Sequence, residues 1–292
     1  MAVPRSVVIV ILVISLLTIV ATAAPLIFTS GPGPSVHLSV RGEVVELYGY
    51  GPYRQMPAEV AIQGLAQDLI TLLVAVPMLL LSLWRTQRGS TVAYLVLTGS
   101  VGYLFVQYVL YLAMAMYNEL FLVWVVLVLL LFQALVRLLL YGVGAVASWH
   151  RPSVDTRRYV GCFLLVNGTI IGLLWLNVVL PPLLQGTLYP TGLAHFTTMI
   201  VQGFDLALFL PASLFAGYYY LRRSNAGDIL APVYAVFLSL QMAALLAKIG
   251  WMAALGMSAG PALLIIPMLL LGAVIAAYLA LKPHQRRSTI GV

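Results

Sequence analysis

Four of the ionisable side chains that lie within or at the edge of long apolar stretches are candidates for function, because a charge there needs either a partner or a use. They are Asp68, Asp205, Lys248 and Glu119. A charge at the middle of a bilayer costs on the order of 3 kcal/mol on insertion scales. Carboxylates bind cations and amines and transfer protons, and an ammonium group can neutralise them. Function is therefore sought first among these residues.

The spacing of these residues from flanking arginines predicts that they share one depth in the membrane. Asp68 lies seventeen residues before Arg85, and Asp205 lies seventeen residues before Arg222. At about 1.5 Å per helical residue, each carboxylate is roughly 25 Å from its arginine. Lys248 lies about twenty residues into its own apolar stretch, roughly 30 Å along a helix. All three groups are expected in the outer leaflet.

We expect these groups to form an outer-leaflet polar pocket that binds or transports a small or lipid-like molecule. The ligand classes that fit are an ion, an amine and a lipid headgroup. Glu119 begins the fourth apolar stretch at the same level. The candidate lining residues are amides and phenols at similar depth: Gln63, Gln67, Gln107, Tyr108, Tyr111, Gln202 and Gln241.

Three other interpretations of the charged residues stay open. One aspartate can pair with Lys248 to fix helix packing, or Lys248 can extend to the outer headgroups. Asp68 and Asp205 can act as acid and base on a lipid headgroup, because paired carboxylates suit hydrolysis when their pKa values differ. The chain can also be a non-catalytic structural subunit whose charges lock a membrane complex.

The composition predicts an all-α fold of about eight transmembrane helices. Hydrophobic residues make up 62% of the 292 positions and charged residues only 8%, whereas a soluble domain carries about 25% charged residues. An apolar segment of about 20 residues is long enough to span a bilayer as a helix. The apolar segments are 6–28, 58–84, 91–117, 120–142, 159–182, 196–221, 229–255 and 261–281.

The basic residues predict an orientation in the cell membrane with both termini in the cytoplasm. Positive charges gather in cytoplasmic loops. Eleven basic residues fall on one predicted side and only Arg41 and Arg54 on the other. The eleven are Arg5, Arg85, Arg88, Arg151, Arg157, Arg158, Arg222, Arg223, Lys282, Arg286 and Arg287. A net charge of +7 is thus explained by topology, and no nucleic-acid partner is expected.

The N-terminal segment allows a second interpretation. Arg5, the apolar run 7–20 and the small residues 21–24 resemble a signal peptide with a cleavage site, and cleavage would leave seven helices. The apolar run continues through Phe28 without stopping at the small residues, which favours a retained helix. Whether residues 1–23 are cleaved stays open.

Weak self-similarity predicts a parallel internal repeat of four plus four helices within a single transmembrane domain, with halves 1–150 and 151–292. The second segment contains Gln63 and Asp68, and the sixth contains Gln202 and Asp205; each aspartate lies seventeen residues before a cytoplasmic arginine. An even number of helices per unit makes the copies parallel. The two aspartates are then expected at the interface between the halves.

The outer connection 30–57 is predicted to form a hairpin and loop. Residues 36–40 and 43–47 alternate polar and apolar around Arg41 and Gly42, which is typical of a short β-hairpin. The tyrosines of 48–54 form either an aromatic lid over the site or an interfacial aromatic belt, and the belt is the favoured interpretation.

Several chemistries have no sequence support. The four histidines, His37, His150, His195 and His284, fall in loops or at helix ends, where none could ligate haem within the bundle. No common zinc-protease, serine-hydrolase or nucleotide-binding motif occurs. The single cysteine, Cys162, excludes an internal disulfide. We expect no cofactor and no metal, and the sequence resembles no family whose motifs match residue by residue.

Overall fold

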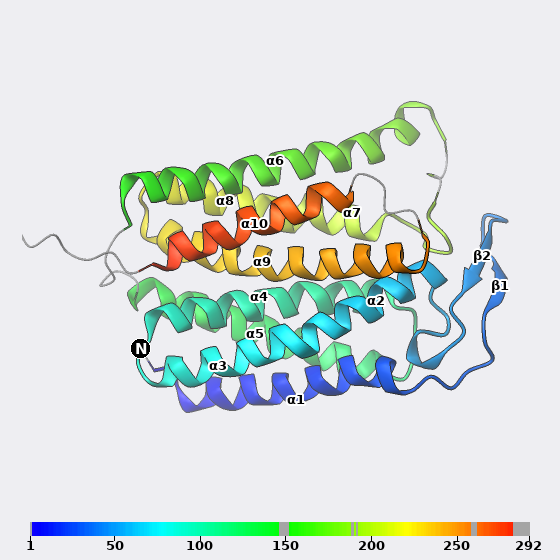
Figure 1. The fold of residues 1–292 in the computed structure, drawn as a ribbon, viewed down its shortest axis with the longest axis horizontal. Helices are drawn as coiled ribbons and strands as arrows, with labels where there is room; N and C mark the ends of the chain where they lie inside the picture. Colours follow the sequence, from blue (N-terminus) through cyan, green and yellow to red (C-terminus); the bar gives the residue numbers. More distant parts are fainter. Residues whose placement is uncertain (1, 146–151, 188–189, 191, 258–261, 283–292) are drawn as a thin grey trace, which may run out of the picture.

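A computed structural model describes residues 2–145, 152–187, 190, 192–257 and 262–282. Long helices run side by side in a bundle, and a small hairpin stands beyond one end of it (Figure 1). We call this the hairpin end. The start of the first helix and the end of the last lie at the opposite end (Figure 1). Arg151, Arg286 and Arg287, three of the basic residues that predicted the orientation, lie outside the described residues.

The prediction of eight long apolar helices is confirmed within the described part of the chain, and such helices indicate a multi-pass membrane protein. Two of the spans are each built from three helical pieces. The helices are α1 Arg5–Ile27, α2 Ala58–Ile70 with η2 Thr71–Ala75 and α3 Val76–Gln87, α4 Thr91–Met114, α5 Phe121–Ala145, α6 Val154–Leu184, α7 Ile200–Phe204 with η4 Asp205–Phe209 and α8 Leu210–Leu221, α9 Asn225–Ala254 and α10 Ala262–Leu281.

Serine caps begin three of the helices at the end opposite the hairpin. The side chains of Ser90, Ser153 and Ser224 accept hydrogen bonds from the backbone N–H groups of Ala93, Thr156 and Gly227. Each cap satisfies an N–H that has no partner inside its helix and stabilises the helix by about 1 kcal/mol. Each of these short polar connections therefore ends in a capped helix start.

Helices α4 and α9 form the centre of the bundle. Most of the apolar window of each is buried, whereas α6 and α10 bury only a small share of theirs. The two central helices pack against each other (Figure 1). Gly99 of α4 allows this approach, since a Cβ atom there would lie 2.6 Å from the Cβ of Val236. The exposed apolar faces of α6 and α10 are those expected to face lipid.

The second and sixth spans each contain a five-residue π-helical segment followed by a proline. In η2 the N–H of Val76 bonds the carbonyl of Thr71, and in η4 the N–H of Leu210 bonds the carbonyl of Asp205. The next residue is Pro77 in one span and Pro211 in the other. Proline has no N–H and clashes with the carbonyl four residues earlier. The wider π turn accommodates it within a continuous span.

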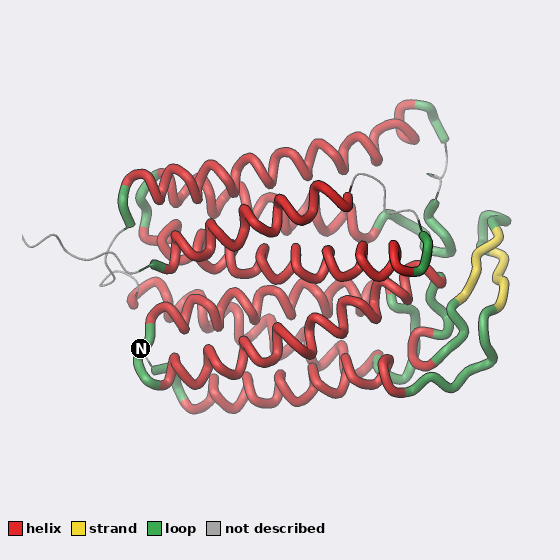
Figure 2. The backbone as a smooth tube through the Cα atoms, in the orientation of Figure 1, coloured by secondary structure: helices red, strands yellow, loops and turns green. Residues whose placement is uncertain are grey.

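The predicted hairpin is confirmed. Strands β1 Ser35–Leu38 and β2 Val44–Leu47 pair antiparallel, with His37 opposite Val45 (Figure 2). The 3-10 turn η1 Gly51–Tyr53 follows and leads into α2. Tyr53 is 1% exposed and belongs to the core, so the aromatic segment after the hairpin turns inward at this residue.

Candidate binding site around Asp68

Asp68 lies inside the bundle and is held by two phenol hydroxyls. Its carboxylate has no exposed surface. The hydroxyl of Tyr53, in η1, donates to Oδ2 at 2.7 Å, and that of Tyr111, in α4, lies 3.0 Å from Oδ1. The Tyr111 hydroxyl also lies 3.0 Å from the carbonyl of Gly64. The carboxylate is thus positioned from three elements: α2, α4 and the turn after the hairpin.

Helical spacing explains why α2 and α4 meet through polar groups. Gly64, Asp68 and Thr71 are separated by four and then three residues, which places them on one face of the second span. Tyr103, Gln107 and Tyr111 are separated by four and four residues on α4. Side chains from the two faces reach each other: Tyr111 bonds Asp68 and Gln107 bonds Thr71.

Thr71 connects the deeper part of this contact. Its hydroxyl lies 2.7 Å from Oε1 of Gln107, 2.9 Å from the Tyr103 hydroxyl and 2.8 Å from the carbonyl of Gln67. Thr71 is also the first residue of the π segment η2. A run of hydroxyl and amide groups therefore continues from the Asp68 level toward the middle of the second span.

Two buried donors beside this network have no hydrogen-bond partner among the described residues. They are Nε2 of Gln107 and Nε1 of Trp124. Exchanging the amide O and N of Gln107 leaves an acceptor unpaired in place of a donor, because only one end of the amide meets Thr71. The Trp124 ring packs edge-on against Tyr111, with ring centres 5.8 Å apart. Buried polar groups are normally paired, so these atoms can serve a ligand.

Lys248 of α9 approaches Asp68 without forming a close ion pair. The charge of Lys248 acts on the Asp68 carboxylate. The ion pairs within 4.0 Å in the described part of the chain do not include Asp68 with Lys248. The lysine is partly buried. An ammonium at this range lowers the cost of the buried carboxylate while leaving its oxygens to the two tyrosines.

Asp205 has different partners from Asp68. Its Oδ2 accepts a hydrogen bond from Nε1 of Trp175, in α6, at 2.6 Å. Asp205 is partly exposed and is the first residue of η4. No hydrogen bond joins the two aspartates in the described part of the chain, and Asp205 instead bonds Trp175 between α6 and the sixth span. The catalytic pairing of the two carboxylates stays a prediction.

Some of the other candidate residues lie in the interior of the bundle, and others are exposed. Gln67 is buried behind Asp68, and the Tyr108 ring packs edge-on against that of Tyr111, with centres 6.0 Å apart. Gln241 has a buried Oε1 without a partner among the described residues. Gln202, in α7, is partly exposed. Gln63 lies apart from them at the surface, where its Nε2 donates to Oε1 of Glu59 at 3.3 Å.

Glu119 is exposed at the surface, away from the buried carboxylate of Asp68. Its Oε1 is 2.6 Å from Nη2 of Arg54, both side chains being exposed. The hydrogen bond from Arg54 lowers the pKa of Glu119 from its usual value. The pair joins the residues just after η1 to the start of α5. Exposed ion pairs contribute little stability, so this contact mainly orients the turn that carries Tyr53.

The phenol beside the carboxylate is a neutral donor. Tyr53 lies in η1, before the second span begins, and burial raises its pKa well above 10.0, with further upward contributions from the Asp68 and Tyr111 charges. At physiological pH its hydroxyl therefore keeps its proton and donates to Asp68. Tyr53 therefore belongs to the interior, whereas Tyr50 is exposed at the surface, and the choice between a lid and an aromatic belt stays a prediction.

Sequence reasoning did not single out Thr71, Tyr103 or Trp124. The spacing of Tyr103, Gln107 and Tyr111 by four residues was a usable signal, because it marks one helix face. The partner of Asp205, Trp175, carried no such signal. No group of three or more histidine, cysteine or acidic residues that could hold a metal occurs in the described ranges.

The chain matches no protein-family model, no curated protein and no solved structure. Its class therefore rests on its own helices, which are those of a multi-pass membrane protein.

Proposed function

We propose that this membrane protein binds and transports a small cation or amine, with Asp68 as the binding carboxylate. The observation that carries the proposal is a fully buried carboxylate whose hydrogen-bond partners are two neutral phenols, with an ammonium group nearby but beyond ion-pair distance. A buried charge without a close counter-ion is costly. A bound cation would supply a positive charge close to the Asp68 carboxylate. If the aspartate were purely structural, Lys248 would have to supply that charge.

Neighbouring groups support a ligand of modest size. The unpaired Nε2 of Gln107 and Nε1 of Trp124 are donors, and donors do not ligate a cation. They can bind an oxygen of the same ligand, as an amino alcohol or a phosphoethanolamine headgroup would offer, or a water molecule that travels with an ion. The ligand class thus includes the lipid headgroups considered from sequence.

The proposed location is the cell membrane, with the hairpin end outside and both termini in the cytoplasm. The arginine distribution supports it. In this orientation Tyr53 closes Asp68 from the external side. Membrane lipids are the expected surroundings, and the apolar faces of α6 and α10 would contact them.

We also propose that the halves 1–150 and 151–292 are copies of one unit. The π segments and the prolines that follow them support this relation between the second and sixth spans. Their register differs from the one that aligns the aspartates, because Asp68 lies three residues before η2 whereas Asp205 begins η4. Aligned by the π segments, Asp205 corresponds to Thr71. The acidic residue of the second half would then lie about one helical turn away from the position that Asp68 occupies in the first half.

The test compares Asp68→Asn with the matched change Asp205→Asn. Purified protein is screened by thermal unfolding against Na⁺, K⁺, choline and ethanolamine, and any stabilising solute is then followed for uptake into proteoliposomes. A ligand at a hundred times its Kd stabilises by about 2.7 kcal/mol. We expect Asp68→Asn to abolish both the stabilisation and the uptake, and Asp205→Asn to retain binding.

The alternatives give different results in the same samples. A lipid-headgroup enzyme requires both carboxylates, so either variant would stop release of headgroup from lipid in detergent. A structural subunit predicts no stabilisation by any of these solutes and a lower Tm in Asp68→Asn. Binding that survives Asp68→Asn would refute the proposed site.

A further inference from the structure

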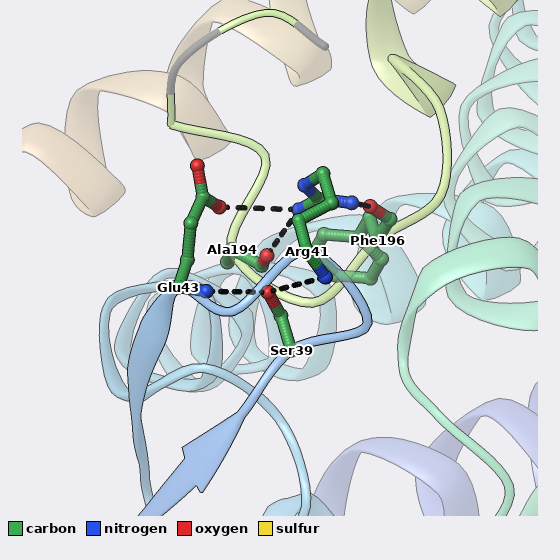
Figure 3. A network of polar contacts seen from close by, with 5 residues as sticks. All are labelled: Ser39, Arg41, Glu43, Ala194 and Phe196. Carbon is green, nitrogen blue, oxygen red and sulfur yellow. Dashed lines mark hydrogen bonds and ion pairs between the residues drawn. The ribbon is translucent and has the colours of Figure 1, made fainter. Parts of the chain in front are cut away.

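The hairpin is fastened to the loop before α7 by one buried arginine. Arg41, at the tip of the hairpin, donates from Nη1 to the carbonyl of Phe196 at 2.8 Å and from Nη2 to that of Ala194 at 2.5 Å (Figure 3). Its side chain is 3% exposed, and Glu43 lies 3.2 Å from Nη2. Ser39 accepts the backbone N–H groups of Arg41 and Glu43 and shapes the tip (Figure 3). The two segments thus hold a fixed position relative to each other.

His195 lies between the two carbonyls that Arg41 binds. The residue before it, Ala194, has a φ of 52°, in the left-handed region that side chains other than glycine rarely adopt. Such strain costs about 1–3 kcal/mol and persists only where surrounding contacts maintain it. Here the maintaining contact is Arg41. The strained backbone presents the imidazole of His195 to the hairpin.

The imidazole it meets belongs to His37 of β1. The ring centres are 5.7 Å apart, with the planes at 83°. Two imidazoles that share one tetrahedral ion at about 2.0–2.1 Å from each nitrogen have centres roughly 5–6 Å apart. The observed separation falls in this range, and rotation about the soft χ2 angles turns one nitrogen of each ring toward a common point.

The nitrogens of His195 are available for such a ligand. Nδ1 and Nε2 are both shielded from solvent and have no hydrogen-bond partner among the described residues. Burial, and then the charge of His37, lower the pKa of His195 below 6.5. The ring is therefore neutral at physiological pH, which is the form that binds metal.

We propose that His37 and His195 form a binding site for a divalent transition-metal ion such as Zn²⁺, with water in the remaining coordination positions. The ion would join the hairpin of the first half of the chain to the loop of the second half. Neutral imidazole is a preferred ligand of these ions. The site is independent of Asp68 and does not rest on the proposed transport function.

The experiment is calorimetric titration of the full-length protein, purified without a polyhistidine tag, with ZnCl₂ in detergent. Wild type is compared with His37→Ala, His195→Ala and the control His284→Ala, which removes a histidine outside the described residues. We expect one Zn²⁺ per chain with a Kd of about micromolar. Each of the first two variants should weaken binding at least about tenfold, and the control should bind as wild type does.

Thermal unfolding provides the second measurement. Zn²⁺ should raise the Tm of wild type and of His284→Ala but not that of the His37 and His195 variants, while the Tm values in EDTA show that all four are folded. If an alanine variant does not fold, His37→Gln and His195→Asn replace it. Absence of Zn²⁺ binding by wild type, or binding that both single variants retain, overturns the proposal.

Discussion

The partners of Asp68 determine what each neighbouring side chain contributes. Tyr53 reaches the carboxylate from the turn η1 and Tyr111 reaches it from α4, each through one hydroxyl. Both hydroxyls donate to the same buried carboxylate. Removal of either one would leave the carboxylate with one hydrogen bond fewer and raise the free-energy cost of burying it. The two tyrosines differ in one respect. Tyr53 sits on a segment that continues from the hairpin, whereas Tyr111 is fixed within the core.

Removing either hydroxyl should destabilise the unliganded protein. A hydrogen bond to a charged group contributes about 1.5–3 kcal/mol, so Tyr53→Phe and Tyr111→Phe should each lower the free energy of unfolding by that amount. Chemical denaturation in detergent measures it. Tyr117→Phe is the matched control, because Tyr117 is 79% exposed and its loss should change nothing. Equal stability of all three variants would contradict the hydrogen-bond geometry.

Part of the site could be predicted from the depth of its residues along the helices. Asp68 and Tyr111 were named together because both are polar positions at one predicted depth, and the structure joins them. Depth along a helix says nothing about which way a side chain faces. Glu119 and Gln63 share that depth but point to the rim. Asp205 also shares it, and its partner Trp175 comes from a different helix, which depth alone could not reveal.

The close contact of α4 with α9 depends on the absence of a Cβ atom at Gly99. A Cβ on Gly99 would meet Cβ and Cγ1 of Val236 at 2.6 and 2.7 Å and the carbonyl of Val233 at 2.8 Å. One turn further along the same helix, Gly102 has open space in place of these neighbours. The two glycines thus form a natural pair for comparison.

Gly99→Ala should separate the central helices and lower stability by about 1–3 kcal/mol, the usual cost of overpacking. Gly102→Ala should be neutral or stabilising by up to about 1 kcal/mol, because alanine favours the helix more than glycine does. Thermal unfolding of the two variants in one detergent measures the difference. A neutral Gly99→Ala would show that α4 and α9 do not pack as closely as described.

The contact between the hairpin and the 192–199 loop should weaken in acid. The pKa of His195 is lowered when the loop contacts the hairpin. Between that lowered pKa and 6.5, the loop detached from the hairpin therefore binds more protons than the loop in contact with it. The contact is lost as pH falls through this range. The titratable group that faces the ring is His37, and the charged Arg41 binds the carbonyls of the residues on either side of His195. The protection of the loop amides against hydrogen exchange, relative to their intrinsic rates, should therefore fall below pH 6.5 in wild type.

The matched variant for this pH effect is His195→Gln, which keeps a polar side chain without a titrating ring. Its loop amides should exchange at a rate that does not depend on protonation in this range, once the intrinsic pH dependence of exchange is subtracted. A wild-type profile identical to that of the variant would exclude His195 as the titrating group.

Hydropathy located the elements well because a spanning helix averages its signal over many residues. The second segment was expected at 58–84 and is observed as Ala58–Gln87. The least accurate start was that of α6, expected at 159 and found at Val154. Its first turn holds Asp155 and Arg157, which lower the window average although Ser153 caps the helix. Arg157 forms a buried ion pair with Asp228 at 2.6 Å, a long-range contact that hydropathy does not report.

For the whole molecule, the orientation can be tested with a single-cysteine background, since Cys162 is the only cysteine. In a Cys162→Ser chain, Gly42→Cys places a thiol on the hairpin and Arg88→Cys places one at the opposite end. We expect a membrane-impermeant maleimide to label the first in intact cells and the second only after lysis. The reverse pattern would invert the orientation that the arginines predict.

The fastening of the hairpin by Arg41 has a mechanical consequence for any rocking of one half against the other. The hairpin belongs to the first half of the chain, yet its tip is bound to a loop of the second. A relative rotation would therefore strain the connection that runs from β2 into η1. Tyr53 stands at the end of that connection, so such a rotation would pull its hydroxyl away from Asp68 and weaken the hydrogen bond that holds the buried carboxylate.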